Sequence, residues 1–296
     1  MLPFYNSGKN TLRRAGMTQG IAVVTGASRG LGRGIARALG SRGLTVYVTG
    51  RSSGDDALDR VAAEITAAGG QGIAVRVDHA KDDEVKALFE RVRKDSGRLD
   101  LLVNNAAAVY PMDLAVPGPY WEKPLHLVDM IDVGLRSNYV AAYYATPLMI
   151  ETGGALMAHV SFYGAVSYFH GPAYGAAKAG TDKMSFDMAV DLRGHDVASV
   201  SIWPGFILTE MLQSIPREHL PPDIAANLPN FETPDFTGLV LERLWRDPER
   251  MALSGQTLIG AELGLRYGIR DLDGKQPMVY SQMMGQPSGR FIAPGA

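Results

Sequence analysis

A short apolar run followed by a glycine-rich turn and a helix constrains the fold of this chain most strongly. Ile21-Ala-Val-Val24 is continuously apolar, which indicates a buried strand, and Thr25-Gly-Ala-Ser-Arg-Gly-Leu-Gly32 leads into a predicted helix that reaches Leu39. A turn of this kind lets the backbone approach a pyrophosphate at the helix N-terminus. Glycine-rich turns are common, so the flanking strand and helix are what predict a dinucleotide site here.

Strands and helices alternate along the rest of the chain. Further strands are predicted at 44–48, 72–77, 99–103, 155–160 and 197–203. Helices are predicted at 55–68, 82–96, 129–150 and 172–193. This alternation predicts an α/β fold of Rossmann type, in which helices cover both faces of a doubly wound, mainly parallel sheet. Ligands of such sheets lie beyond the carboxyl ends of the strands, where the strand order reverses.

Composition limits the class of protein. The formal net charge is −2 with both signs scattered, which argues against a nucleic-acid partner. The chain has no cysteine, so it has no disulfide framework or thiolate metal site, which suits a reducing compartment. The apolar stretch around 139–150 is too short to span a bilayer. We therefore expect a soluble cytoplasmic protein without a metal site.

The domain organisation is predicted to be simple. Residues 1–16 contain three basic side chains and no acidic one, and they lack a long apolar core, so we expect a disordered tail rather than a signal peptide. Residues 17–296 are expected to form one domain, because large α/β folds often reach this length. The segment 210–234 contains five prolines, and we expect it to form a lid over the substrate.

A second chemical motif lies in the predicted helix that Pro172 begins. Tyr174 and Lys178 are four residues apart, so their side chains share one helix face. A nearby ammonium lowers the pKa of a phenol from its usual value of about 10, which would let Tyr174 act as an acid or base. Ser161 ends the preceding strand and could polarise a carbonyl that Tyr174 protonates. This spacing more often means a lysine lying beside a packed ring, so the glycine turn is needed to favour catalysis.

The glycine turn also contains a competing motif. Gly26-Ala-Ser28-Arg-Gly30 matches the G-x-S-x-G of α/β-hydrolases, with Ser28 as nucleophile. The candidate bases are His159, His170 and His195. A hydrolase oxyanion loop comes from an earlier strand, and only about 20 residues precede this turn. A hydrolase is therefore the remote alternative.

Taken in order, the motifs resemble those of a short-chain dehydrogenase/reductase from about Met17 onward. The matching segments are Thr25 to Gly32, Asn104-Asn-Ala-Ala107, the set Ser161, Tyr174 and Lys178, and Pro204-Gly-Phe-Ile-Leu-Thr209. Within this family, three segments resemble the subgroup called dehydrogenase/reductase member 1-like: Val133-Gly-Leu-Arg136, Trp203-Pro-Gly205 and 266–274.

The resemblance implies an NAD(P)-dependent oxidoreductase that interconverts a carbonyl and an alcohol. Tyr174 would exchange the proton with the substrate oxygen, Ser161 would hydrogen-bond that oxygen, and Lys178 would lower the pKa of Tyr174 and hold the ribose hydroxyls. The resemblance also implies a homodimer or homotetramer. The residues expected to contact the cofactor are Thr25, Gly26, Ser28, Arg29, Gly30, Leu31, Gly32, Arg51, Asp78, Asn105, Ala106, Tyr174, Lys178, Pro204, Gly205, Ile207 and Thr209.

Two arginines predict a preference for NADP(H) over NAD(H). Enzymes of this type that use NAD carry an acidic residue at the end of the second strand, where this chain has Thr49-Gly-Arg51. The guanidinium groups of Arg51 and Arg29 suit a 2′-phosphate. The substrate is expected to be a small, fairly apolar molecule, because several apolar residues are candidates for its pocket. They are Tyr110, Met112, Trp121, Phe162, Tyr163, Tyr168 and Met211.

Two positions depart from the family pattern. Ala107 stands where the family usually has glycine, and Gly134 stands where it usually has a fourth catalytic residue, an asparagine. We expect a backbone carbonyl and water near Gly134 to take over the proton relay of that asparagine, and Asn138 to pack or contact a subunit partner. Gly134 also motivates a second interpretation, a cofactor-binding sensor with little turnover.

Overall fold

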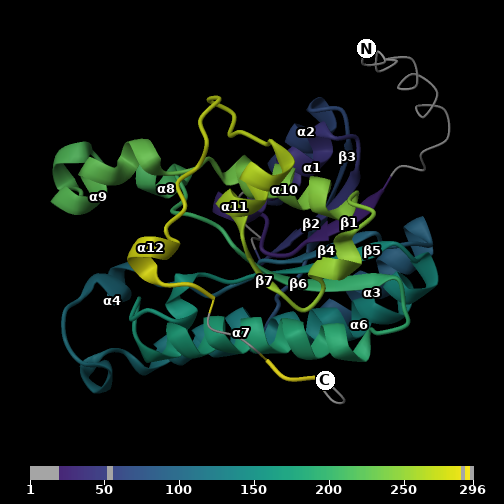
Figure 1. The fold of residues 1–296 in the computed structure, drawn as a ribbon, viewed down its shortest axis with the longest axis horizontal. Coiled ribbons are helices and arrows are strands. Elements are labelled where there is room, and N and C mark those ends of the chain that lie inside the picture. Colours follow the sequence, from purple (N-terminus) through teal and green to yellow (C-terminus); the bar gives the residue numbers. More distant parts are fainter. Residues whose placement is uncertain (1–19, 52–55, 288–290, 294–296) are drawn as a thin grey trace, which may run out of the picture.

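Seven parallel strands form one sheet at the centre of the molecule (Figure 1). The computed structural model describes residues 20–51, 56–287 and 291–293, so the tail expected at 1–16 lies outside the described residues. The strands are β1 (Ile21–Val24), β2 (Thr45–Gly50), β3 (Gln71–Arg76), β4 (Leu101–Asn104), β5 (Ala155–Val160), β6 (Val197–Trp203) and β7 (Thr257–Ile259). Their order is β3-β2-β1-β4-β5-β6-β7, and all neighbouring pairs are parallel.

Helices cover both faces of this sheet. Every residue of β1 and β5 is buried, and continuous apolar runs are typical of strands that are covered on two sides. One face packs against α1 (Gly30–Ser41), α2 (Ala57–Ala67), α10 (Pro234–Trp245) and α11 (Gly260–Tyr267). The other face packs against α3 (Asp82–Ser96), α6 (Ser137–Thr152) and α7 (Pro172–Asp191).

Short helices lie at the end of the molecule where the chain leaves β4 and β6. Figure 1 shows α4 (Pro111–Ala115), α8 (Glu210–Gln213), α9 (Pro222–Asn227) and α12 (Ser281–Met284) together at the left. Single turns of 3₁₀-helix occur at Tyr120–Glu122, Leu125–Val128, Tyr163–Ala165, Arg217–His219, Leu228–Asn230 and Arg250–Leu253. The strand order reverses between β1 and β4, so a ligand crevice is expected beside their carboxyl ends.

The Rossmann-type fold predicted from the sequence is confirmed. Three strands and one helix have the predicted bounds: β1, β5, β6 and α3. The helix predicted at 129–150 is divided instead, because α5 (Asp129–Ile131) and α6 are joined by a π-helical turn at Asp132–Arg136. The sequence pattern gave no prediction for β7, α10 or α11, although α10 supplies much of the core on one face.

Candidate active site

Three glycines shape the turn between β1 and α1 for different physical reasons. Gly26 and Gly30 have φ angles of +64° and +56°, in the left-handed region that side chains other than glycine rarely adopt. A Cβ on Gly32 would lie 2.4 Å from the carbonyl oxygen of Gly26, so this glycine lets the helix pack on the turn. A Cβ on Gly26 would lie 2.8 Å from the Cα of Ala106. The turn is therefore held close to the chain after β4.

Hydrogen bonds fasten this turn to the segment after β4. The Thr25 hydroxyl accepts from the backbone N–H groups of Asn105 and Ala106, both at 2.9 Å. The Asn105 amide donates to the carbonyl oxygens of Thr25 and Gly26 at 2.9 and 3.0 Å. Thr25 is fully buried, so it braces the turn from behind, while Asn105 and Ala106 also line the cavity described next.

One cavity of about 690 Å³ runs along the carboxyl ends of the strands. It contains all the expected catalytic residues and all the expected cofactor residues except Thr25 and Asp78. The side chain of Asp78 accepts from the backbone N–H of Ala80 at 3.1 Å, and its neighbours Val77 and His79 line the cavity instead. The cavity thus joins the glycine turn at one end to Tyr174 and Lys178 at the other.

Ser161, Tyr174 and Lys178 come together where β5 meets α7. The Ser161 hydroxyl donates to the Lys178 carbonyl oxygen at 3.0 Å, and Lys178 Nζ donates to the Val160 carbonyl oxygen at 3.1 Å. Lys178 Nζ lies 5.5 Å from the centroid of the Tyr174 ring. The spacing of four residues therefore does place the ammonium and the phenol on the same side of α7.

Burial determines the protonation states of Tyr174 and Lys178. It raises the pKa of Tyr174 above its usual range, and it lowers the pKa of Lys178 to about 8, an effect that the nearby Asp182 carboxylate partly opposes. The pKa of Tyr174 is thus raised by burial, and not lowered by Lys178 as the spacing predicted. Tyr174 is accordingly a protonated phenol at neutral pH, the form that can donate a proton to a carbonyl oxygen.

Gly134 lies in the π-helical turn between α5 and α6. Within that turn Ser137 N donates to the Asp132 carbonyl oxygen five residues earlier, which widens the helix. The Asn138 amide donates to the Gly134 carbonyl oxygen at 2.8 Å, and Asn138 is buried within its own chain. The helix is thus loosened at Gly134, and Asn138 packs inside its own chain, the first of the two outcomes expected for it.

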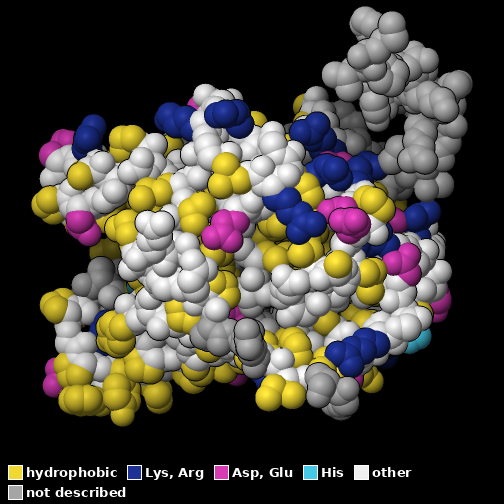
Figure 2. Space-filling model, viewed as in Figure 1, with side chains coloured by type: hydrophobic (Ala, Val, Ile, Leu, Met, Phe, Trp, Pro, Cys, Tyr) yellow, Lys and Arg dark blue, Asp and Glu magenta, His cyan; other side chains and the backbone are white. Residues whose placement is uncertain are grey.

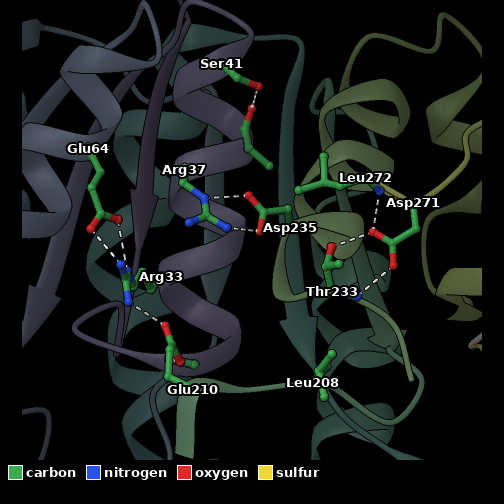
Figure 3. A network of polar contacts seen from close by, with 12 residues as sticks. Arg33, Arg37, Ser41, Glu64, Leu208, Glu210, Thr233, Asp235, Asp271 and Leu272 are labelled. Atoms are coloured by element: carbon green, nitrogen blue, oxygen red, sulfur yellow. Dashed lines mark hydrogen bonds and ion pairs between the residues drawn. The ribbon is translucent and has the colours of Figure 1, made fainter. Parts of the chain in front are cut away.

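A carboxylate from α8 accepts a hydrogen bond from a backbone N–H of the glycine turn. Glu210 accepts from the backbone N–H of Gly30 at 3.1 Å and from Arg33 at 2.7 Å, and Arg33 also pairs with Glu64 at 2.6 Å (Figure 3). The N-terminus of α1 is where a helix attracts anions. No sequence pattern indicates Glu210 as a site residue, because its contact with Gly30 joins positions 180 residues apart.

The histidines of the hydrolase alternative do not assemble around Ser28. His159 is fully buried in β5 and pairs with Asn104 at 3.2 Å, His170 precedes α7, and His195 is exposed after that helix. Among the described residues no histidine hydrogen-bonds Ser28. The G-x-S-x-G match therefore reflects the glycine turn alone.

The described residues contain neither a candidate metal site nor a candidate membrane span. No cluster of three or more His, Asp or Glu residues in this part of the chain could hold a metal ion. Within the same residues, no helix has the length and apolar character needed to cross a membrane.

Comparisons with known proteins agree with this geometry. The sequence model described as short chain dehydrogenase matches residues 20–220. The human protein "Dehydrogenase/reductase SDR family member 1" is 39% identical over 291 residues, which cover 93% of this chain and 91% of that protein. The "3-oxoacyl-[acyl-carrier-protein] reductase" of Synechocystis sp. is 31% identical and covers 81% of this chain and 95% of its own.

A solved structure is similar over most of the fold. It is a double mutant of a short-chain dehydrogenase/reductase from Serratia marcescens. The superposition has a TM-score of 0.70 at 26% sequence identity, and it covers 81% of this chain and 95% of the other.

Proposed function

Because this chain belongs to the short chain dehydrogenase family and is an oxidoreductase that uses NAD(P), we propose that it reduces the carbonyl of a small, fairly apolar molecule with NADPH, or oxidises the matching alcohol. The observation that carries this proposal is the single cavity that joins the glycine turn to Ser161, Tyr174 and Lys178. The Synechocystis relative is named for reducing a 3-oxoacyl group, which supports carbonyl chemistry.

The residues of the cavity fit a dinucleotide. Gly30 lines the cavity in the left-handed region at the start of α1, and its N–H donates to Glu210, a bond that a phosphate would replace; we assign this end to the pyrophosphate. Pro204, Gly205 and Thr209 also line the cavity, and we assign them to contact with the nicotinamide. When bound, the nicotinamide supplies or accepts the hydride.

We assign the proton chemistry to the residues at the start of α7. Tyr174 donates the proton to the carbonyl oxygen, and its raised pKa keeps that proton available at neutral pH. The Ser161 hydroxyl turns from the Lys178 carbonyl toward the substrate oxygen and orients it. Lys178 carries its charge below a pKa of about 8, so it can favour the phenolate when the reaction runs toward the ketone.

The preference for NADP(H) rests on Arg29 and Arg51. Both arginines line the cavity, and among the described residues neither forms an ion pair with a carboxylate. Their guanidinium groups are therefore available to a 2′-phosphate. Calorimetric titration should give a lower Kd for NADPH than for NADH. Arg51→Ala should raise the Kd for NADPH and leave the Kd for NADH unchanged. Tighter binding of NADH would contradict the preference.

Tyr174→Phe tests the chemistry. The variant should lose about 10²–10⁴-fold in kcat, the usual contribution of a general acid, while it keeps its NADPH affinity and its melting temperature. Turnover is measured as NADPH consumption with a panel of ketones, aldehydes and quinones. A wild-type chain that binds NADPH tightly and turns over no member of the panel would instead favour the sensor interpretation.

Assembly and location belong to the proposal as well. We propose a homodimer or homotetramer in the cytoplasm, with the segment 210–234 as a lid over the substrate. The position of α8 beside the glycine turn supports the lid, since Glu210 is the first residue of that segment.

A further inference from the structure

A second cavity lies beside the first and is used by none of the steps above. Its volume is about 510 Å³, and two segments form it: residues 120–131, which follow α4, and residues 168–176, which run into α7. Its walls include Trp121, Leu127, Met130, Tyr168, Ala173 and Ala176. Two of the apolar residues that the sequence suggested for a substrate pocket, Trp121 and Tyr168, therefore line this second space.

The two cavities share a wall at the catalytic tyrosine. Leu127 and Met130 belong to the same apolar cluster as the Tyr174 ring. Helix α7 turns Tyr174 and Lys178 toward the first cavity and Ala173 and Ala176 toward the second. A ligand in the second cavity would thus lie just behind the phenol.

His170 connects the two spaces. It lines both cavities, and its φ of +58° makes it the one residue other than glycine in the left-handed region among those that the structure describes. Its ring lies edge-on to Tyr174 with centroids 5.2 Å apart. Such strain is typical of backbone that must place a side chain at a functional position.

The second cavity is chemically suited to hydrocarbon. Lys123 and His170 are its only charged or ionisable lining residues apart from tyrosine, and the alanines of α7 leave room on its inner side. Trp121 and Tyr168 at its rim are 71% and 83% exposed. Figure 2 shows hydrophobic side chains gathered at the lower left of that view, over α4 and the segment after it. Exposed apolar surface on this scale usually marks a binding site.

We infer that the second cavity binds an apolar arm of the substrate while its carbonyl lies at Tyr174. The inference rests on the proposed function and specifies its substrate class: ketones with a hydrocarbon chain or ring system long enough to pass His170. Continuity with the first cavity favours the substrate itself as the occupant over a second protein chain or a membrane surface.

A series of straight-chain 2-ketones with NADPH tests the inference. Once the chain passes His170, kcat/KM should rise by about fourfold for each added methylene, and it should level off when the cavity is full. Ala176→Phe places a ring in the second cavity, so it should lower kcat/KM for long ketones at least tenfold more than for short ones. Ala179→Phe is the matched control, because Ala179 is exposed one turn later on α7 and lines neither cavity.

The outcomes separate this inference from the proposed function. Turnover that does not depend on chain length, or an Ala176→Phe variant that slows long and short ketones equally, overturns the second subsite but keeps the reductase. An Ala176→Phe variant that changes only the sedimentation coefficient assigns the cavity to a contact between chains and also overturns it.

A binding measurement decides the point if no ketone turns over. Decanol should change the tryptophan fluorescence of the wild-type chain through Trp121, with a smaller change in Ala176→Phe and none in Trp121→Phe. An equal response in all three proteins would mean that the second cavity is not the binding site.

Discussion

Glu232 is a buried carboxyl group that should make stability depend on pH. It is 2% exposed, and its side chain accepts from the Thr237 hydroxyl at 3.2 Å. Burial, with a smaller contribution from the Asp271 charge, raises the pKa of Glu232 to about 8. Between about 4.5 and 8 the folded chain holds a proton that the unfolded chain lacks. The free energy of unfolding therefore falls as the pH rises through this window.

Glu232→Gln isolates this effect, because glutamine stays neutral and can keep the Thr237 contact. Burial lowers the pKa of His79 and of His159 to about 4, so their contribution to the free energy of unfolding increases as the pH rises to about 6.5. We therefore compare the two proteins above that pH. From about pH 6.5 to 8 the wild type should lose on the order of 1 kcal/mol relative to Glu232→Gln, or about 2 °C in Tm. Parallel melting curves across this range would show that Glu232 is ionised in the folded chain.

Gly134 and Asn138 belong to one chain of hydrogen bonds at the position of the missing asparagine. The Gly134 carbonyl is held by the Asn138 amide, and the Asn138 carbonyl accepts in turn from Asn104 at 3.2 Å. A Cβ on Gly134 would lie 3.8 Å from the Cβ of Ala177, an ordinary contact beside Lys178, so a small side chain fits. We propose that a water near the Gly134 carbonyl carries the proton relay from Lys178.

Three variants test which group carries the relay. Asn138→Ala should cost less than about tenfold in kcat, because it only repositions a carbonyl. Gly134→Leu should cost much more, because it fills the space beside Ala177, and Gly134→Ala serves as the control that fits. Rates are measured at saturating NADPH. If Asn138→Ala proves the more damaging change, the relay runs through Asn138 instead.

At the scale of elements, α8 is fastened to α1 through a carboxylate that a phosphate would have to displace. The bond from Gly30 N to Glu210 uses a donor that the glycine turn would offer the pyrophosphate. Glu210→Gln removes the negative charge from this position, and we expect the Kd for NADPH to fall about two- to fivefold.

The matched control for Glu210→Gln is Glu64→Gln. Glu64 pairs with Arg33 as Glu210 does, but it makes no bond to Gly30, so its loss should leave the affinity for NADPH nearly unchanged. Titrations at low and at moderate salt should show a larger effect of Glu210→Gln at low salt. Weaker binding by Glu210→Gln would mean that the carboxylate orders α8 around the bound cofactor.

Local sequence patterns were enough to predict most of the fold and the motif residues of the site. Ile21–Val24 is a continuous apolar run, and Val197–Trp203 is interrupted only by Ser199 and Ser201, so burial on both faces determined their strands. β7 has three residues, too few for a periodicity to show. The contact of Glu210 with Gly30 and the cavity between 120–131 and 168–176 join distant segments, and no spacing in the sequence encodes such contacts.

At the scale of the whole molecule, α6 presents an apolar face that the single chain leaves uncovered. Tyr139 and Tyr143 lie one turn apart on this helix and are 54% and 65% exposed, whereas Ala142 and Ala145 on its other side are buried against the sheet. Two aromatic rings side by side on a long helix suit a self-complementary contact between two copies. We therefore expect this face to support the proposed homo-oligomer.

Tyr143→Arg should separate the copies, because it places a charge where the contact excludes water. Sedimentation equilibrium should give a monomer for this variant and a dimer or tetramer for the wild type. Leu265→Arg is the control, because Leu265 is 58% exposed on α11, away from this face. Since binding of a partner adds to stability by mass action, the Tm of the wild type should rise with protein concentration, and that of Tyr143→Arg should not. A monomeric wild type, or dissociation by Leu265→Arg and not by Tyr143→Arg, would remove α6 from the interface.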